Sequence, residues 1–178
     1  MVSRSKFKRH DSRQFDQLRD VSLQSGISRY AEGSCFIKMG HTHVMCLASV
    51  EEDLPEWRAE KGLGWVTGEY AMIPRATHTR TRRESVKGKI SGRTSEISRL
   101  VGRSLRAVVD FAKLGPRTIT VDCEVLQADG GTRCAAITGG YVALEQACHT
   151  LKKEGLIKDW PLADSVAAVS VGMVKENL

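Results

Sequence analysis

The chain has 178 residues, of which 41% are hydrophobic and 27% charged, a composition typical of one folded globular domain and not of a disordered chain. No apolar run reaches the roughly 18 residues of a membrane helix, and the basic N-terminus lacks the apolar stretch of a secretory signal. We therefore expect a soluble cytoplasmic protein without a membrane partner. Its five separated cysteines, with no C-x-x-C pair, predict reduced and buried thiols: Cys35, Cys46, Cys123, Cys134 and Cys148.

The net charge of +6 is concentrated in one segment of the chain. Residues 75–106 contain ten Lys or Arg and only two Glu, whereas the other residues contain 17 basic and 19 acidic side chains. So concentrated a positive field favours a polyanionic partner such as nucleic acid. A solvated helix face and loop is the alternative interpretation.

The first half of the chain predicts short strands joined by turns. Alternating or β-branched runs indicate an edge strand and three further strands, at residues 21–27, 33–39, 42–50 and 65–73. The Gly40-His41 turn predicts that the second and third form a hairpin, and Pro74 ends the fourth. Residues 51–63 are charged, include Pro55 and are expected to form a loop.

The second half predicts helices that alternate with strands. Residues 75–91 lack any hydrophobic period, which predicts a long exposed loop, and residues 94–112 have the apolar spacing of a helix. On that helix Arg99, Arg103 and Arg106 form one basic stripe. Strict alternation then predicts a strand over 117–125, followed by a helix over 134–153 and an apolar strand over 165–174. The fold class is therefore α/β (α+β), in a single domain covering residues 1–178.

The turn between the strand 117–125 and the next helix has the composition of an anion site. It contains Asp129, Gly130, Gly131, Thr132 and Arg133. Adjacent glycines leave the backbone open, and the free N–H groups of a helix start attract anions. Phosphate is the first ligand to test, although most turns of this kind are only turns.

A second helix start carries the same combination of features. Arg93 lies where the helix over 94–112 begins, and Ser91 or Thr94 can cap that helix. Arginine suits bidentate contact with phosphate, so the two helix starts could converge on one anion. The alternative is that Arg93 is an ordinary surface residue.

Other candidate residues are weaker. His41 and His43 have the H-x-H spacing of some zinc sites, but the Gly40 turn also explains polar residues there. Cys134 begins a helix, where a thiolate is favoured, yet without a histidine partner it is better interpreted as a packed thiol. Asp122 and Glu124 share one strand face and could hold magnesium, or could simply face solvent.

Several motifs resemble the ribonuclease PH family, in one register from about residue 19 to residue 174. The resemblance rests on four segments: residues 31–34 (AEGS), 68–80 (GEYAMIPRATHTR), 92–94 (GRT) and 126–133 (LQADGGTR). It implies an α/β fold with a mixed sheet packed against helices. It also implies a phosphate-dependent 3′→5′ exoribonuclease that trims precursor tRNA, releases nucleoside diphosphates and can run in reverse as a nucleotidyltransferase.

Carried over position by position, the resemblance implies roles for particular residues. Those that bind the attacking phosphate would be Arg93, Gly131, Thr132 and Arg133. Those in the basic loop that contact RNA and support ring assembly would be Arg75, Arg80 and Arg83. The family forms hexameric rings built from dimers, so a homo-hexamer with RNA as partner is expected, and His78 is interpreted as an exposed or RNA-facing residue.

The chain also departs from the family. His41, His43 and Cys134 replace residue types that are common at those positions. The acidic motif that supplies the family's magnesium-linked aspartates follows the strand near Val174 and is not among these 178 residues. The chain therefore resembles a member truncated at its C-terminus, with Mg²⁺ expected but its ligands outside the chain. A catalytically inactive RNA- and phosphate-binding ring subunit is the alternative, and little or no phosphorolysis is predicted from these residues alone.

Overall fold

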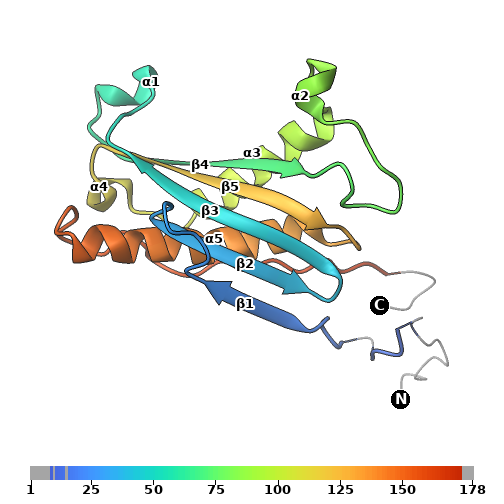
Figure 1. The fold of residues 1–178 in the computed structure, drawn as a ribbon. Helices are drawn as coiled ribbons and strands as arrows, with labels where there is room; N and C mark the ends of the chain where they lie inside the picture. The colour runs from blue at the N-terminus through green and yellow to red at the C-terminus, as the bar shows by residue number, and fades with distance from the viewer. Residues whose placement is uncertain (1–8, 10, 15, 174–178) are drawn as a thin grey trace.

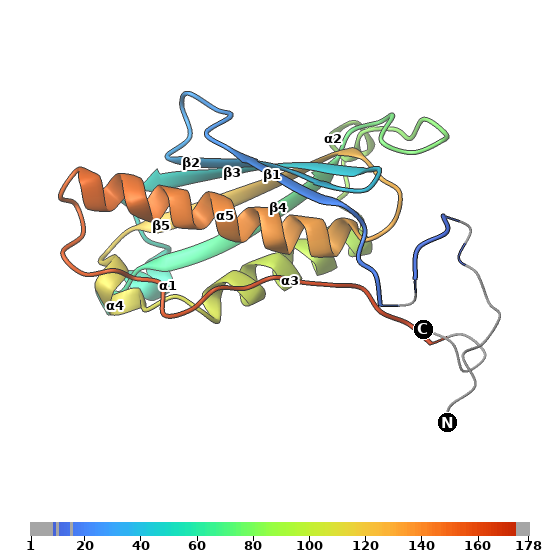
Figure 2. The same cartoon turned by 90° about the horizontal axis from the view of Figure 1, so that it is seen from below.

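A five-stranded mixed sheet with two long helices on one of its faces forms the framework of the molecule (Figures 1 and 2). The computed structural model describes residues 9, 11–14 and 16–173. The strands lie in the order β1-β2-β3-β5-β4, with bounds β1 Val21–Ser25, β2 Gly33–Met39, β3 Thr42–Glu51, β4 Trp65–Met72 and β5 Thr118–Gln127. Only the β4–β5 pair is parallel, and the other three pairs are antiparallel. The predicted mixed α/β architecture is confirmed.

The strand predictions for the first half and for β5 are confirmed. β2 and β3 form the expected hairpin, with Met39 opposite Thr42, and β1 is an edge strand whose five residues are all exposed. The predicted alternation along β5 is present, because every second residue is buried: Ile119, Val121, Cys123 and Val125. The other face of the sheet carries polar side chains such as Asp122 and Glu124.

Two long helices cover the inner face of the sheet. α3 (Gly92–Arg106) packs on β4, and α5 (Thr132–Lys153) packs on β2 and β3. The α5 helix approaches β2 so closely that a Cβ added at Gly33 would lie 1.9 Å from the Ala143 carbonyl oxygen. Glycine at position 33 therefore sets how deeply α5 packs against the sheet.

The loop predictions need small corrections. The segment 51–63 contains the one-turn helix α1 (Glu56–Ala59), and the segment 75–91 contains the one-turn helix α2 (Glu84–Lys87). Both are single turns without a buried residue, so the hydrophobic pattern had no means of indicating them.

The helix predicted over 94–112 ends early, at Arg106. Beyond it, Val109 forms a bridge with Leu162, and the Asp110 N–H donates to the Pro161 carbonyl at 2.7 Å. Asp110 then caps the short helix α4 (Phe111–Leu114) by accepting hydrogen bonds from the Ala112 and Lys113 N–H groups. The apolar spacing continues past Arg106, but these tertiary hydrogen bonds divide the segment.

The strand predicted over 165–174 is wrong for residues 165–173, which form no strand, and Val174 lies outside the described residues. This segment runs along α5, where the Ala168 N–H donates to the Thr138 hydroxyl at 3.1 Å. Val169, Val171 and Met173 are exposed. Apolar composition favours a strand only where a neighbouring strand accepts its hydrogen bonds, and no described strand does so here.

The prediction that the cysteines are unpaired and mostly buried is confirmed. All five are free; four are buried and Cys134 is half-buried. Burial raises the pKa of Cys35 to about 11 and that of Cys148 to about 12, so these two thiols stay protonated. Among the described helices, none combines the length and the apolarity needed to cross a bilayer.

The close packing at Gly33 gives the first testable prediction. Gly33→Ala pushes a methyl group into the α5 backbone and should lower the free energy of unfolding by about 2 kcal/mol or more. Gly172→Ala is the matched control, because no atom lies within 4 Å of a Cβ at that position. Urea unfolding of both variants measures the difference, and equal stabilities would contradict this account of the packing.

Candidate functional site

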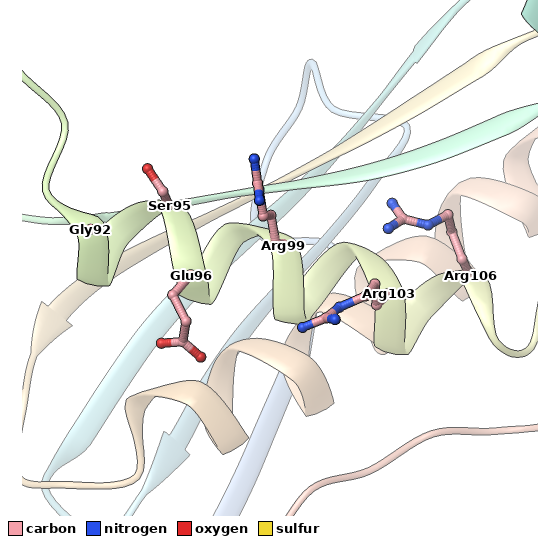
Figure 3. Close-up of a pocket in the computed structure, with 6 residues that line it drawn as sticks. All are labelled: Gly92, Ser95, Glu96, Arg99, Arg103 and Arg106. Atoms are coloured by element: carbon pink, nitrogen blue, oxygen red, sulfur yellow. The ribbon is translucent and has the colours of Figure 1, made fainter.

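The first turns of α3 and α5 lie side by side. The Arg133 side chain on α5 donates to one carboxylate oxygen of Glu96 on α3, from Nη2 at 2.6 Å and from Nε at 3.2 Å. Figure 3 shows Glu96 on α3 near the helix start at Gly92. The two helix starts are therefore in contact, and their convergence on one anion stays a prediction.

The charges around Glu96 bring Arg93 into the same region. The pKa of the Glu96 carboxyl lies below its ordinary value, first because Arg133 donates hydrogen bonds to it. The positive charges of Arg133, Arg93 and Arg103 add to this effect. Glu96 thus pairs directly with Arg133 and lies in the positive field of Arg93 and Arg103.

The two helix starts differ in how their N–H groups are satisfied. At α3 the Ser91 hydroxyl accepts a hydrogen bond from the Thr94 N–H at 3.1 Å, which confirms the predicted cap. At α5 the cap position is Gly131, which has no side chain to offer. The N-terminus of α5 is therefore the better backbone site for an anion, and α3 contributes side chains beside it.

Thr132, the first residue of α5, is hydrogen-bonded to a residue of the sheet. Its side chain is buried, and the Tyr70 hydroxyl on β4 donates to the Thr132 hydroxyl at 3.0 Å. Nothing in the sequence pattern distinguishes Tyr70 from other residues of a strand. Its place in a strand pattern predicts a core position but does not identify a hydrogen-bond partner 62 positions away.

A groove of about 620 Å³ runs along α3 from this region (Figure 3). It is lined by Gly92, Ser95, Glu96, Arg99, Arg103 and Arg106. Arg99 and Arg103 are exposed, but Arg106 is half-buried. Its guanidinium donates to the Val66 carbonyl at 3.0 Å and lies 4.5 Å from the Trp65 ring centroid. Two of the three arginines in the predicted stripe are therefore available to an anion, and the third holds α3 on the sheet.

The basic loop after β4 is anchored at its base beside the glycine turn. Ala76 is buried, and its carbonyl accepts a hydrogen bond from the Ala128 N–H at 2.8 Å. The Thr81 N–H closes the loop onto the Pro74 carbonyl at 2.8 Å. Beyond this base the basic side chains are exposed, as predicted: Arg75, Arg80 and Arg83, with His78 among them.

The described carboxylates do not gather into a cluster of three metal ligands. Asp122 and Glu124 point to the sheet face opposite the helices, so the sheet separates them from Arg133. Partial burial raises the pKa of both carboxyl groups. The negative charge of Glu51 raises the pKa of Asp122 further, whereas the positive charge of Arg83 lowers that of Glu124. Asp129 pairs with Arg19. Within residues 9, 11–14 and 16–173 no three His, Cys, Asp or Glu side chains group as metal ligands.

The remaining candidates have structural surroundings that account for them. The His43 ring packs edge-on against Phe36, with ring centroids 5.8 Å apart. Burial raises the pKa of the Cys134 thiol even though Arg133 lies next to it. Cys134 is therefore a packed thiol and not an activated nucleophile.

Comparison with known proteins identifies the family. The family described as "3′ exoribonuclease family, domain 1" matches residues 17–148. The chain belongs to the 3′ exoribonuclease family. It is 58% identical over 165 residues to the ribonuclease PH of Methylocella silvestris, and 61% identical over 158 residues to that of Caulobacter vibrioides. The resemblance to ribonuclease PH that the motifs carried is confirmed.

Solved structures show the same fold. An Archaeoglobus fulgidus exosome with RNA bound to the active site matches with a TM-score of 0.71 and 25% identity, over 88% of this chain and 62% of that one. Rice Rrp46 matches with a TM-score of 0.67 and 22% identity, over 88% of this chain and 64% of that one. The alignments cover 93% and 89% of this chain but only 70% and 66% of the Methylocella and Caulobacter proteins. The chain thus spans about two thirds of the length of its relatives.

The Glu96 carboxylate gives the second prediction. Glu96→Gln removes a negative charge that faces three arginines, so inorganic phosphate should bind about threefold more tightly at low salt. Glu154→Gln makes the same change at the far end of α5 and should leave binding unaltered. Calorimetry at low and high salt measures both. Weaker binding by Glu96→Gln would mean that the carboxylate serves mainly to hold Arg133 in place.

Proposed function

We propose that the protein is a phosphate-dependent 3′→5′ exoribonuclease that trims the 3′ ends of precursor tRNA and releases nucleoside diphosphates. Family membership and relatives named ribonuclease PH support this function. The observation that carries the proposal is the meeting of the α3 and α5 helix starts through Glu96 and Arg133. That meeting supplies the conditions for holding the phosphate that attacks the RNA.

Each proposed phosphate ligand contributes a different physical effect. The N–H groups at Gly131 and Thr132 begin α5, where the helix dipole favours negative charge. Arg133 can exchange its carboxylate partner for phosphate oxygens, and Arg93 adds a second guanidinium from α3. Phosphoryl transfer depends on position and charge neutralisation more than on covalent help from the protein, and these groups supply both for the attacking phosphate.

RNA would approach this phosphate from the basic loop. Arg75, Arg80 and Arg83 are exposed on a loop whose base is hydrogen-bonded to the strand that leads into the glycine turn. We propose that they contact RNA phosphates, in a homo-hexameric ring and in the cytoplasm. The structural neighbour with RNA bound to its active site supports an RNA-binding role. Magnesium belongs to the proposed activity, but the described residues form no site for it and no step is assigned to it.

Phosphate binding tests the proposal directly. Arg133→Ala and Arg93→Ala should each weaken the binding of inorganic phosphate at least about tenfold, because each removes a charge-assisted hydrogen bond to the anion. Arg29→Ala, an exposed arginine beside Tyr30, is the control and should bind as the wild type does. Calorimetry or ³¹P NMR measures the affinities. Unchanged affinity in both site variants would overturn the assignment of these ligands.

The reaction is tested with a tRNA that carries extra 3′ nucleotides, in the presence of magnesium and phosphate. Release of nucleoside diphosphates that depends on phosphate supports the proposed enzyme. Release of monophosphates, or release without phosphate, would contradict it. Binding of phosphate and RNA without any release would favour a ring subunit that lacks catalysis.

Arg80 gives a prediction for the RNA surface. Arg80→Ala should weaken RNA binding and lower the salt dependence of its association constant by about one counterion. Fluorescence anisotropy over a range of salt concentrations measures the slope. Arg29→Ala again serves as the control, and an unaltered slope for Arg80→Ala would assign this arginine to assembly instead.

A further inference from the structure

We propose that Thr42 and Arg19 are positioning residues that hold the glycine turn in the shape that binds phosphate. Neither residue belongs to the proposed ligand set, and they lie 88 and 111 positions away from Gly130 in the chain. The inference rests on the proposed function, because it assigns a role to the turn that binds the anion. It concerns the geometry of residues 129–131.

Thr42 contacts the turn from inside the protein. Its side chain is fully buried at the start of β3, and its hydroxyl donates to the Gly130 carbonyl at 2.5 Å. The same hydroxyl accepts a hydrogen bond from the Asp129 N–H at 3.0 Å. One side chain therefore satisfies two backbone groups of the turn.

Arg19 contacts the turn from the irregular segment that precedes β1. Its Nη1 donates to the Asp129 carbonyl at 2.6 Å and lies 3.4 Å from the Gly130 carbonyl. The Asp129 carboxylate lies 3.8 Å from the same nitrogen, and the Arg19 stem packs over Gly40. Arg19 is thereby fixed between the β2–β3 hairpin turn and the glycine turn.

These contacts determine where the N–H groups of the turn point. In a planar trans peptide the C=O and N–H bonds point in opposite directions. Because the Gly130 carbonyl is directed at Thr42, the Gly131 N–H must point away from the core. Because the Asp129 carbonyl is directed at Arg19, the Gly130 N–H must point away from Arg19. At Gly131 no atom lies within 4 Å of where a Cβ would be, so no neighbouring side chain packs over its Cα in that direction.

Glycine makes such a clamp necessary. Gly130 and Gly131 adopt left-handed conformations, with φ of +81° and +70°, and glycine reaches many other conformations at similar energy. A free Gly-Gly turn could rotate its peptide planes and withdraw the N–H groups. Holding two successive carbonyls removes that freedom before the anion arrives, which improves affinity without any new contact to the ligand.

Thr42 is tested by one pair of variants and one control. Thr42→Val keeps the shape of the side chain but loses both of its hydrogen bonds, so it should weaken the binding of inorganic phosphate about tenfold. Thr42→Ser keeps the hydroxyl and should bind phosphate nearly as the wild type does. Thr118→Val is the matched control, since Thr118 is also buried on a strand and donates to the Asp53 carbonyl at 2.6 Å. It should lose stability without losing phosphate affinity.

A second readout reports the turn itself. In ¹H–¹⁵N NMR spectra of the ligand-free protein, Thr42→Val should shift and broaden the Gly130 and Gly131 amide signals, and Thr118→Val should leave them in place. Arg19→Met should produce the same changes to a smaller extent, with Arg29→Met as its control. If Thr42→Val fails to fold, Arg19→Met decides the question by both measures.

The outcomes separate this inference from the proposed function. Phosphate affinity and glycine amide signals that match the wild type in Thr42→Val would overturn the clamp. If the wild type itself does not bind phosphate, the proposed function fails, and the amide signals still report whether Thr42 and Arg19 hold the turn.

Discussion

The parallel pairing of β4 and β5 is the constraint on which the candidate site depends. Parallel neighbours end at the same edge of a sheet, so the segments that follow them emerge together. After β4 comes the basic loop, and after β5 comes the glycine turn, with the Ala76–Ala128 hydrogen bond joining the two. The helices that follow, α3 and α5, consequently begin at this edge (Figure 2). An antiparallel pair would have placed the arginines and the glycines at opposite ends of the sheet.

Electrostatic balance explains how so many cations share one edge without an anion present. Glu96 pairs with Arg133 and lies in the field of Arg93 and Arg103, while Asp129 pairs with Arg19. Both pairs are partly exposed, so each is worth little in stability. The Glu96 pair keeps the Arg133 guanidinium oriented and yet exchangeable, whereas Arg19 stays on the backbone of the glycine turn. An anion that offers two or three oxygens can displace one exposed carboxylate at small cost.

The sequence predicted the local elements well because each has its own repeating pattern. Alternation located β5 and helical spacing located α5, and glycine, serine and arginine indicated the two helix starts. Predictions failed where a distant partner decides the outcome. The hydrogen bond that the Asp110 N–H donates to the Pro161 carbonyl and the bridge between Val109 and Leu162 divide the segment after Arg106. Residues 165–173 lie along α5 without a described strand beside them.

The same distinction applies within the site. The glycine turn and Arg93 could be singled out from residue type alone, since glycine and arginine are unusual in what they offer an anion. Tyr70, Thr42 and Arg19 are ordinary residues in a strand, a hairpin and an N-terminal segment. Each becomes significant only through hydrogen bonds to residues at least 62 positions away. No local pattern contains that information.

The flexibility of the glycine turn and the contacts that order it are thus supplied by different parts of the chain. The turn between β5 and α5 needs glycine because a side chain at Gly131 would have to adopt a strained left-handed backbone at the start of α5. Glycine by itself would leave the turn disordered, since it loses the most conformational freedom on folding. The buried Thr42 hydroxyl and the Arg19 guanidinium restore the order by donating to the Asp129 and Gly130 carbonyls, which leaves the N–H groups of Gly130 and Gly131 to other partners. The stability of the β2–β3 hairpin, which carries Thr42, is therefore coupled to the geometry of the glycine turn.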